Sequence, residues 1–348
     1  MWARPASASS WSSCCSAAGC AGSPRSPTSS PSPPPTPARR LKAPPVRLRP
    51  LGRTGFTVSE IGFGAASWWG KPRFPERSAL ALVHAALDGG VTVFDTGASY
   101  SAGQAEPRLG RALRGRDTSN LLVATKAGTF AEGRRIGRDF TPAAIVASAE
   151  RSLANLGLEA LPLLQLHGPA IAELTDELLA ALEGLKARGL VRALGVNSFD
   201  PAVIGYALGL PTIDVVMVDY NVLRPEREPL IARAAAAAKG VLAGMPLAMG
   251  HTGGQVTRLR GPQDLWYAAR GLLRHRREVT SGARFGFLNR LPGMTGAQAA
   301  LAYVLANRDV ACAVMGTTRM GHLTENLAAS ELSLPVETLA QIRAAQAR

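Results

Sequence analysis

Strand-like and helix-like segments alternate eight times along this sequence, and this alternation constrains the fold more than any other feature. Each short apolar, β-branched run is followed by a longer segment with apolar residues every three or four positions. The predicted strands span 61–65, 91–95, 121–126, 161–167, 190–196, 213–218, 241–247 and 311–315. Alternation at this spacing predicts a parallel sheet with crossover helices, and eight such units close a (β/α)8 barrel of the TIM type.

The segments between these strands begin with helix-start signals. Thr141 and Asp200 are each followed by proline, which suits an N-cap and the first helical position. The predicted helices span 77–88, 105–114, 142–156, 173–188, 201–208, 226–238, 296–306 and 321–329, with a last helix at 335–347. Upstream, the runs 48–51 and 56–59 flank a turn and predict an N-terminal β-hairpin. We therefore assign residues 46–348 to a single barrel domain.

Residues 1–45 differ from the rest in being rich in Ser, Pro and Ala and free of acidic residues. Such a segment buries too little apolar surface to offset its ordering entropy, so we predict a disordered leader. Two interpretations of this leader remain open. Its Arg- and Ser-rich composition resembles an organelle transit peptide, whereas an unselected leader would leave the protein in the cytoplasm, which is the predicted location.

The net charge of +14 is concentrated near the N-terminus. Of the 39 basic and 25 acidic residues, eight basic and no acidic ones lie in 1–59, which leaves 31 basic residues against 25 acidic ones. A second basic cluster at 258–290 lacks the interleaved aromatic residues of a single-strand binder. No apolar run approaches the roughly 18 residues of a membrane helix. The sequence therefore predicts neither a nucleic-acid partner nor a membrane span.

Cysteine usage adds little. Three of the four cysteines lie in the leader, and only Cys312 lies in the barrel region. This pattern predicts no disulfide framework and no metal site, and it suits a reducing compartment.

Four titratable residues of four kinds follow three consecutive predicted strands. Asp95 ends the strand 91–95 and Tyr100 follows five residues later, while Lys126 and His167 end the next two strands. The C-terminal ends of strands in a parallel barrel share one rim, where the chemistry of that fold is built. Each residue alone has an ordinary alternative, such as a cap, a solvated charge or a satisfied polar group. Their coincidence predicts a site.

These side-chain types suit proton donation to a carbonyl oxygen as hydride reaches its carbon. A phenol has an unperturbed pKa near 10, too high for an efficient general acid at neutral pH. A nearby ammonium stabilises the phenolate and lowers that pKa. A carboxylate beside the lysine would keep the lysine charged, and a histidine at the same rim would hydrogen-bond a substrate carbonyl.

Six motifs in order make the sequence resemble the aldo-keto reductase family. They are GGVTVFDTGASY (89–100), AEPRLGRAL (105–113), VATKAG (123–128), LLQLHGP (163–169), GLVRALGVNSF (189–199) and MGTTRMGHLTENLAA (315–329). The resemblance implies a (β/α)8 barrel, NAD(P)H as cofactor and reversible reduction of aldehydes or ketones. It also implies roles for the four residues: Tyr100 as general acid, Lys126 lowering the pKa of that tyrosine, Asp95 paired with Lys126, and His167 orienting the carbonyl.

The resemblance further implies a cofactor site, which departs from the family at two positions and in the order of one residue pair. Asn197 and Ser198 match the pair that holds the nicotinamide carboxamide, in inverted order. Met217 stands where relatives often have Gln, and Gly244 stands where an aromatic often stacks. The phosphate and adenine contacts fall on Gly316, Thr317, Thr318, Arg319, Glu325 and Asn326. A guanidinium beside a helix N-terminus suits a nucleotide phosphate, and Arg319 favours NADPH, with NADH as the alternative.

The substrate is the least specified feature. Trp68 and Trp69 lie at the family's position for pocket aromatics, and the insert 249–294 lies where relatives close over the cofactor. We predict a small-molecule carbonyl or sugar substrate and no particular oligomeric state. Two alternatives remain open. One is an NAD(P)-dependent sugar dehydrogenase running in the oxidative direction. The other is a non-catalytic, cofactor-binding subunit resembling the potassium-channel β-subunits.

Overall fold

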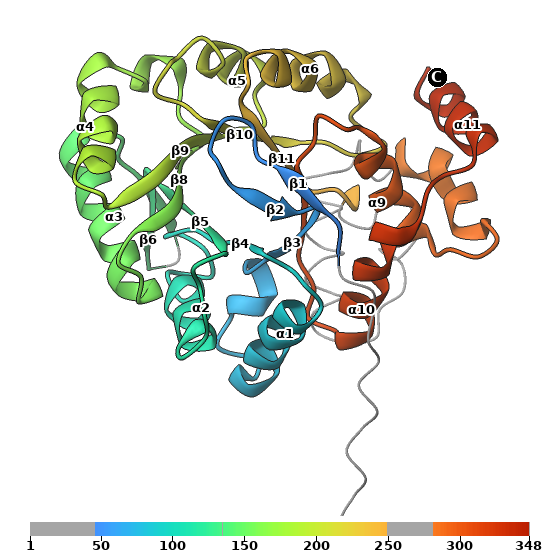
Figure 1. Ribbon diagram of the computed structural model, residues 1–348, viewed down its shortest axis with the longest axis horizontal. Coiled ribbons are helices and arrows are strands. Elements are labelled where there is room, and N and C mark those ends of the chain that lie inside the picture. Colours follow the sequence, from blue (N-terminus) through green and yellow to red (C-terminus); the bar gives the residue numbers. More distant parts are fainter. Residues whose placement is uncertain (1–45, 134, 249–280, 348) are drawn as a thin grey trace, which may run out of the picture. The chain divides into compact units, whose positions relative to one another are not determined.

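Eight parallel strands close into a barrel in the computed structural model, which describes residues 46–133, 135–248 and 281–347 (Figure 1). The strands are β3 (Ile61–Gly64), β4 (Val93–Asp95), β5 (Leu122–Ala127), β8 (Leu161–His167), β9 (Val191–Asn197), β10 (Val215–Asp219), β11 (Gly240–Gly244) and β12 (Cys312–Met315). Their order around the barrel follows the chain, and β12 closes the ring by pairing with β3. The predicted (β/α)8 fold is confirmed.

Helices surround this barrel, and the last of them, Val336–Gln346, packs against the segment Ala283–Arg290. The helices are α1 (Glu76–Asp88), α2 (Ala105–Leu113), α3 (Pro142–Leu156), α4 (Asp176–Ala187), α5 (Pro201–Ala207), α6 (Glu228–Ala236), α9 (Gly296–Ala306), α10 (Met320–Ala328) and α11 (Val336–Gln346). The predicted caps are present: the Thr141 hydroxyl accepts from the Ala144 N–H, and the Asp200 carboxylate accepts from the Ala202 N–H. Each cap satisfies an otherwise unpaired N–H and fixes where its helix begins.

The interior of the barrel is built by the two-residue period of its strands. On β5, Leu122 and Ala124 belong to the inner apolar cluster, and Lys126 is the next residue of that face. On β8 the corresponding series is Leu163, Gln165 and His167. The inner face is therefore apolar toward the strand N-termini and polar toward the C-termini.

The N-terminal hairpin of β1 (Leu48–Pro50) and β2 (Thr57–Ser59) covers the other end of the barrel. Leu51 and Val58 join the inner apolar cluster and are completely or almost completely buried. Gly52 lets the turn approach β11 closely, because a Cβ there would lie 2.3 Å from the Gly240 nitrogen. The predicted hairpin is confirmed, and it seals the base of the barrel.

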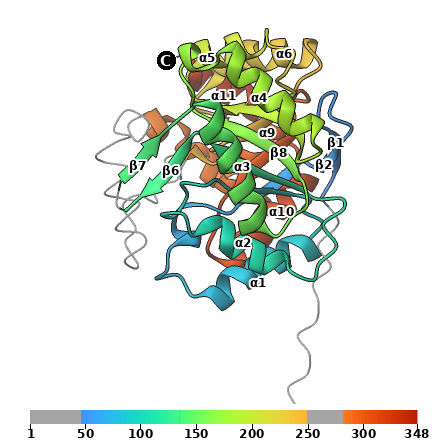
Figure 2. The same ribbon diagram turned by 90° about the vertical axis from the view of Figure 1, so that its left-hand side faces the viewer.

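A second hairpin was not predicted. It consists of β6 (Thr129–Glu132) and β7 (Arg135–Arg138), follows β5 directly and projects from the barrel (Figure 2). Phe130 and Ile136 are both exposed on it. Several strands are also shorter than predicted, β4 and β11 by two residues each. β11 ends at Gly244 rather than at 247, because Met245 turns the chain with a positive φ and the following proline has no N–H for a ladder.

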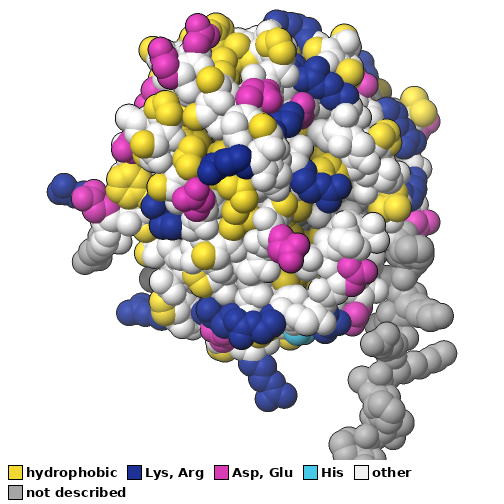
Figure 3. Space-filling model, turned by 60° about the vertical axis from the view of Figure 1, so that its left-hand side comes forward, with side chains coloured by type: hydrophobic (Ala, Val, Ile, Leu, Met, Phe, Trp, Pro, Cys, Tyr) yellow, Lys and Arg dark blue, Asp and Glu magenta, His cyan; other side chains and the backbone are white. Residues whose placement is uncertain are grey.

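The surface mixes charges of both signs. On the face shown in Figure 3, Lys and Arg side chains lie among Asp and Glu side chains. Within the described residues, no helix is long and apolar enough to cross a bilayer. The leader predicted at 1–45 and positions 249–280 of the insert lie outside the described residues, so both predictions stay predictions.

Candidate active site

A buried ion pair forms the base of the site. Lys126 is fully enclosed, and its Nζ donates to both carboxylate oxygens of Asp95 at 2.6 Å and to the Thr96 carbonyl at 2.8 Å. Asp95 reaches it because β4 and β5 are neighbours in the barrel. Burial opposes the positive charge, but Asp95 and Tyr100 together raise the pKa of Lys126 above its usual value. The ammonium is therefore retained inside the barrel.

Tyr100 lies against this ammonium. The Lys126 Nζ is 4.8 Å from the centroid of the tyrosine ring, and a hydrogen bond with the Tyr100 side chain helps to hold the lysine charged. The loop after β4 positions the tyrosine through a hydrogen bond from its N–H to the Gly97 carbonyl at 2.9 Å. The three N–H groups of the ammonium thus face four acceptor atoms: two of Asp95, one of Thr96 and one of Tyr100.

His167 completes the group at the end of β8. Its ring meets the Tyr100 ring edge to face, with centroids 5.4 Å apart and planes at 83°. Burial, followed by the positive charges of Lys126 and Arg138, lowers the pKa of His167 to about 3. The imidazole is therefore neutral at neutral pH. The structure brings all four residues predicted from the strand ends to one rim.

Three further polar side chains belong to this group and were missed in the sequence. Gln165 donates from Nε2 to Asp95 Oδ1 at 3.3 Å, while Thr129 Oγ1 lies 2.6 Å from His167 Nδ1 and 3.0 Å from Ser99 Oγ. Gln165 could have been predicted from the sequence, because it precedes His167 by two residues and therefore lies on the same face of β8. Thr129 could not have been predicted from the sequence, because its position depends on the unpredicted hairpin.

The residues predicted to contact nicotinamide lie on the next strands of the rim. Asn197 ends β9 and pairs in register with His167. Asn197 is 6% exposed, and among the described residues its side-chain amide makes no hydrogen bond. Ser198 accepts from the Asp200 N–H at 3.1 Å. The two departures from the family pattern are neighbours, because the Met217 methyl lies 3.2 Å from where a Cβ on Gly244 would be.

The segment predicted to bind phosphate and adenine runs from β12 into α10. Gly316 to Arg319 form the junction, Arg319 is the N-cap of α10, and no acidic residue occupies the first turn. The Thr317 hydroxyl accepts from the Arg319 N–H at 3.2 Å. Further along, Glu325 accepts from the Thr295 hydroxyl, and the buried Asn326 donates to the Met315 sulfur at 3.4 Å. Asn326 therefore directs its amide inward, against β12.

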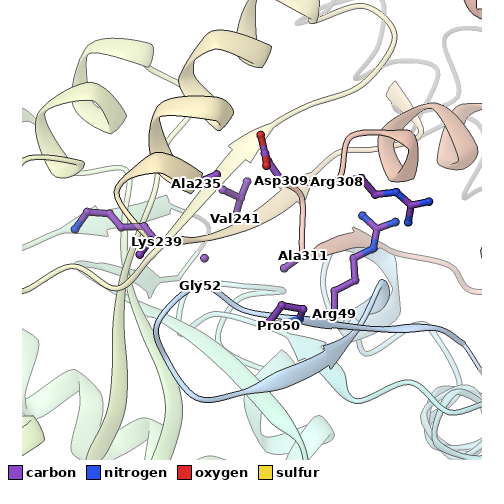
Figure 4. Close-up of a pocket in the computed structure, with 11 residues that line it drawn as sticks. Arg49, Pro50, Gly52, Ala235, Lys239, Val241, Arg308, Asp309 and Ala311 are labelled. Carbon is purple, nitrogen blue, oxygen red and sulfur yellow. The ribbon is translucent and has the colours of Figure 1, made fainter.

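A pocket of about 290 Å³ lies at the opposite end of the barrel (Figure 4). It is lined by Arg49, Pro50 and Gly52 and by the residues that open β11 and β12. The Arg49 guanidinium is already committed to Glu60 and to the carbonyls of Leu305 and Val310. The N-terminal face of this fold serves stability rather than chemistry, so this pocket is not the candidate site.

A sequence model of the aldo/keto reductase family matches residues 60–347. This chain belongs to the aldo/keto reductase family. Among curated relatives, it is 29% identical over 317 residues to L-galactose dehydrogenase of Arabidopsis thaliana, covering 86% of this chain and 94% of that protein. It is 27% identical over 326 residues to D-threo-aldose 1-dehydrogenase of a Pseudomonas species, covering 84% and 95%.

Solved aldo/keto reductase structures share the architecture. The holo form of an aldo-keto reductase from Bacillus halodurans superposes with a TM-score of 0.72 at 28% identity, covering 86% of this chain and 96% of that one. Membership supports an oxidoreductase that uses a nicotinamide cofactor. Within the described residues, no three His, Cys, Asp or Glu side chains are grouped as metal ligands.

The two tryptophans predicted as aldo/keto reductase pocket residues have different surroundings. Trp69 is 1% exposed, donates from Nε1 to the Ala79 carbonyl and meets the Phe63 ring edge on. Trp69 therefore packs within the hydrophobic core, and its substrate contact stays a prediction. Trp68 is only partly buried, and its substrate contact stays a prediction.

Proposed function

We propose that this chain is an NAD(P)H-dependent aldo-keto reductase that reduces an aldehyde or ketone to an alcohol, with Tyr100 as general acid. The observation that carries the proposal is the contact of Tyr100 with a buried, charged Lys126. An ammonium at that position stabilises the phenolate that forms when the tyrosine gives up its proton. Asp95 keeps the ammonium charged at a depth where an unpaired lysine would lose its proton.

The roles of the four residues follow from their positions. Tyr100 gives its hydroxyl proton to the substrate oxygen, and Lys126 lowers the free energy of the resulting phenolate. His167, neutral and beside Tyr100, donates a hydrogen bond to the same oxygen and orients the carbonyl. The bound nicotinamide supplies the hydride. Because these side chains are fixed before substrate arrives, little reorganisation is needed during the reaction.

The residues at the rim fit a dinucleotide phosphate. An N-terminus of α10 without acidic residues, with Arg319 as its first flanking residue, favours a bound anion. The side-chain amide of Asn197 and the hydroxyl of Ser198 provide donors and acceptors for a carboxamide. Arg319 would pair with a 2′-phosphate, which makes NADPH the preferred cofactor and NADH the alternative. Thr317, Thr318 and Glu325 complete the proposed contacts.

A second candidate is NAD(P)-dependent oxidation of a sugar hemiacetal. It is favoured by the names of two relatives, L-galactose dehydrogenase and D-threo-aldose 1-dehydrogenase. The same four residues would serve, because a general acid in one direction is a general base in the other. Sugars and simple carbonyl compounds therefore both belong in the assay.

The test is a titration of the full chain with NADPH and NADH, followed by assays of aldehydes, ketones and sugars in both directions. Tyr100→Phe should reduce turnover by about 10²–10⁴-fold and leave cofactor affinity nearly unchanged, because it removes a proton donor and no cofactor contact. Arg319→Ala should weaken NADPH more than NADH. Equal turnover of Tyr100→Phe and wild type would overturn the mechanism. Binding without turnover on any substrate would instead favour a cofactor-binding subunit.

A further inference from the structure

Ser99, Thr129 and His167 form a line of three hydrogen-bonded polar side chains. Ser99 Oγ lies 3.0 Å from Thr129 Oγ1, and Thr129 Oγ1 lies 2.6 Å from His167 Nδ1. They come from three parts of the fold: the loop after β4, the first residue of β6 and the last residue of β8. Both hydroxyl residues are buried. A buried hydroxyl normally donates its proton in a hydrogen bond. The direction of each bond can therefore be derived from where the hydroxyl protons find acceptors.

The number of hydroxyl protons that find an acceptor decides the direction of these two hydrogen bonds. If Ser99 donates to Thr129 and Thr129 donates to His167 Nδ1, both hydroxyl protons are used. If Nδ1–H instead donates to Thr129, one hydroxyl is left with a buried proton and no acceptor among the described residues. A buried donor without an acceptor is unfavourable, because it has lost its hydrogen bonds to water. The first arrangement is therefore preferred, and it requires an unprotonated Nδ1.

We propose that Thr129, supported by Ser99, is a positioning residue that holds His167 in the tautomer with its proton on Nε2. This inference rests on the proposed function for its catalytic meaning, because an Nε2–H can donate to a substrate carbonyl whereas an unprotonated Nε2 cannot. Among the described residues Nε2 makes no hydrogen bond, and it is not sealed from solvent. It is therefore accessible to a ligand at the rim.

The neutral state of the ring agrees with this arrangement. A protonated imidazole would need an acceptor at Nδ1, whereas the preferred arrangement presents a donor there. Burial and the nearby charges of Lys126 and Arg138 disfavour the imidazolium independently. Thr129 is the first residue of β6. The β6–β7 hairpin therefore contributes to the site the hydroxyl that sets the histidine tautomer.

The experiment compares Thr129→Val, which removes the hydroxyl at nearly constant shape, with Thr129→Ser, which keeps it. The probe is the pair of ¹⁵N shifts of the His167 ring in long-range ¹H–¹⁵N spectra of the full chain. The chain has five histidines, so His167→Asn identifies the His167 signals by their absence. Thermal unfolding of each variant shows that the fold is kept, and Thr129→Ala replaces Thr129→Val if the valine packs poorly.

Wild type and Thr129→Ser should both show an unprotonated Nδ1 and a protonated Nε2. Thr129→Val should show a mixture of tautomers and a kcat lowered by about tenfold, the size expected for one neutral hydrogen bond, with cofactor affinity unchanged. A protonated Nδ1 in wild type, or identical shifts in Thr129→Val and wild type, would overturn the proposal. If Thr129→Val changes the tautomer but Tyr100→Phe turns over as fast as wild type, the proposed function is wrong. The positioning role of Thr129 is kept in that case.

Discussion

At the scale of single residues, the site depends on one buried charge and on the carboxylate that keeps it charged. Lys126 and Asp95 are enclosed by the barrel and make their strongest contacts with each other. Such a pair contributes little net stability compared with apolar residues of similar size, yet removing one partner is costly. Stability and function can therefore be separated at this pair.

Lys126→Met should lower the free energy of unfolding by about 3–5 kcal/mol, because it leaves the Asp95 carboxylate buried without a counter-charge. Adding Asp95→Asn should restore most of that loss, since the asparagine is neutral and still accepts from Gln165. Turnover should stay near background in both variants. Urea denaturation measures the first effect and steady-state kinetics the second. Recovery of turnover in the double variant would contradict the proposed role of the ammonium.

The pKa of His167 predicts a dependence of stability on pH. Because this pKa falls from 6.5 to about 3 on folding, the unfolded chain binds a proton at pH values where the folded chain does not. Stability should therefore fall as pH drops below about 6.5, by about 2 kcal/mol between pH 7 and pH 5 from this residue. Denaturation of wild type and His167→Asn across that range measures it, and the asparagine variant should lack this part of the loss.

Some residues of the site could be predicted from the sequence and others could not. Asp95, Lys126 and His167 were predictable because strand ends of a parallel barrel meet at one rim and the two-residue period fixes which side chains point inward. Ser99 and Thr129 were not predictable, because Ser99 lies in a loop and Thr129 in the unpredicted β6–β7 hairpin, and neither has a periodic signal. The substrate contacts of Trp68 and Trp69 stay predictions, since apolar residues near a strand end serve as core or as rim with the same local pattern.

At the scale of elements, the eight strands and their helices followed from periodicity, and the β6–β7 hairpin did not. Its strands have four residues each and no alternating apolar pattern. Hairpins of this length are held by neighbouring elements and by turn geometry more than by their own composition. The N-terminal hairpin was predictable because its two short runs flank a turn that begins and ends with glycine.

The N-terminal hairpin gives a prediction with a matched control. Gly52→Ala should destabilise the fold by about 2–4 kcal/mol, because its φ is positive and the new Cβ would meet the β11 backbone. Gly55→Ala also has a positive φ but open space around it, so it should cost only about 1 kcal/mol. Both should leave kcat unchanged, since the hairpin lies away from the rim. Equal midpoints in urea for the two variants would contradict the close approach at Gly52.

At the scale of the whole molecule, Glu60 ties the start of the barrel to the end of the chain. Its carboxylate accepts from Arg47 at 2.9 Å, Arg49 at 2.8 Å and Ser330 at 2.7 Å. The carboxylate is fully buried, and the partners lie up to 270 positions apart in sequence. Glu60 thus links segments that the barrel brings together only when its last strand meets its first.

Glu60→Gln should reduce the free energy of unfolding by about 3 kcal/mol, because the Arg49 guanidinium loses the counter-charge for its burial. Glu76→Gln is the control: Glu76 pairs with Arg111 at 2.6 Å, but both side chains are largely exposed, so the loss should stay below about 1 kcal/mol. Neither variant should alter kcat. Similar unfolding midpoints for the two variants would show that the Glu60 cluster does not hold the chain ends together.

The sealed base of the barrel has a consequence for proton traffic. Leu51 and Val58 close that end with apolar side chains, and the layer above them holds Val93, Leu122 and Leu163. Among the described residues, this apolar cluster lies between that end of the barrel and Lys126. In the proposed reaction, the proton that Tyr100 gives up must therefore return from the rim, through the opening that substrate and product use. The rim then serves both as the entrance for substrate and as the route by which the proton returns.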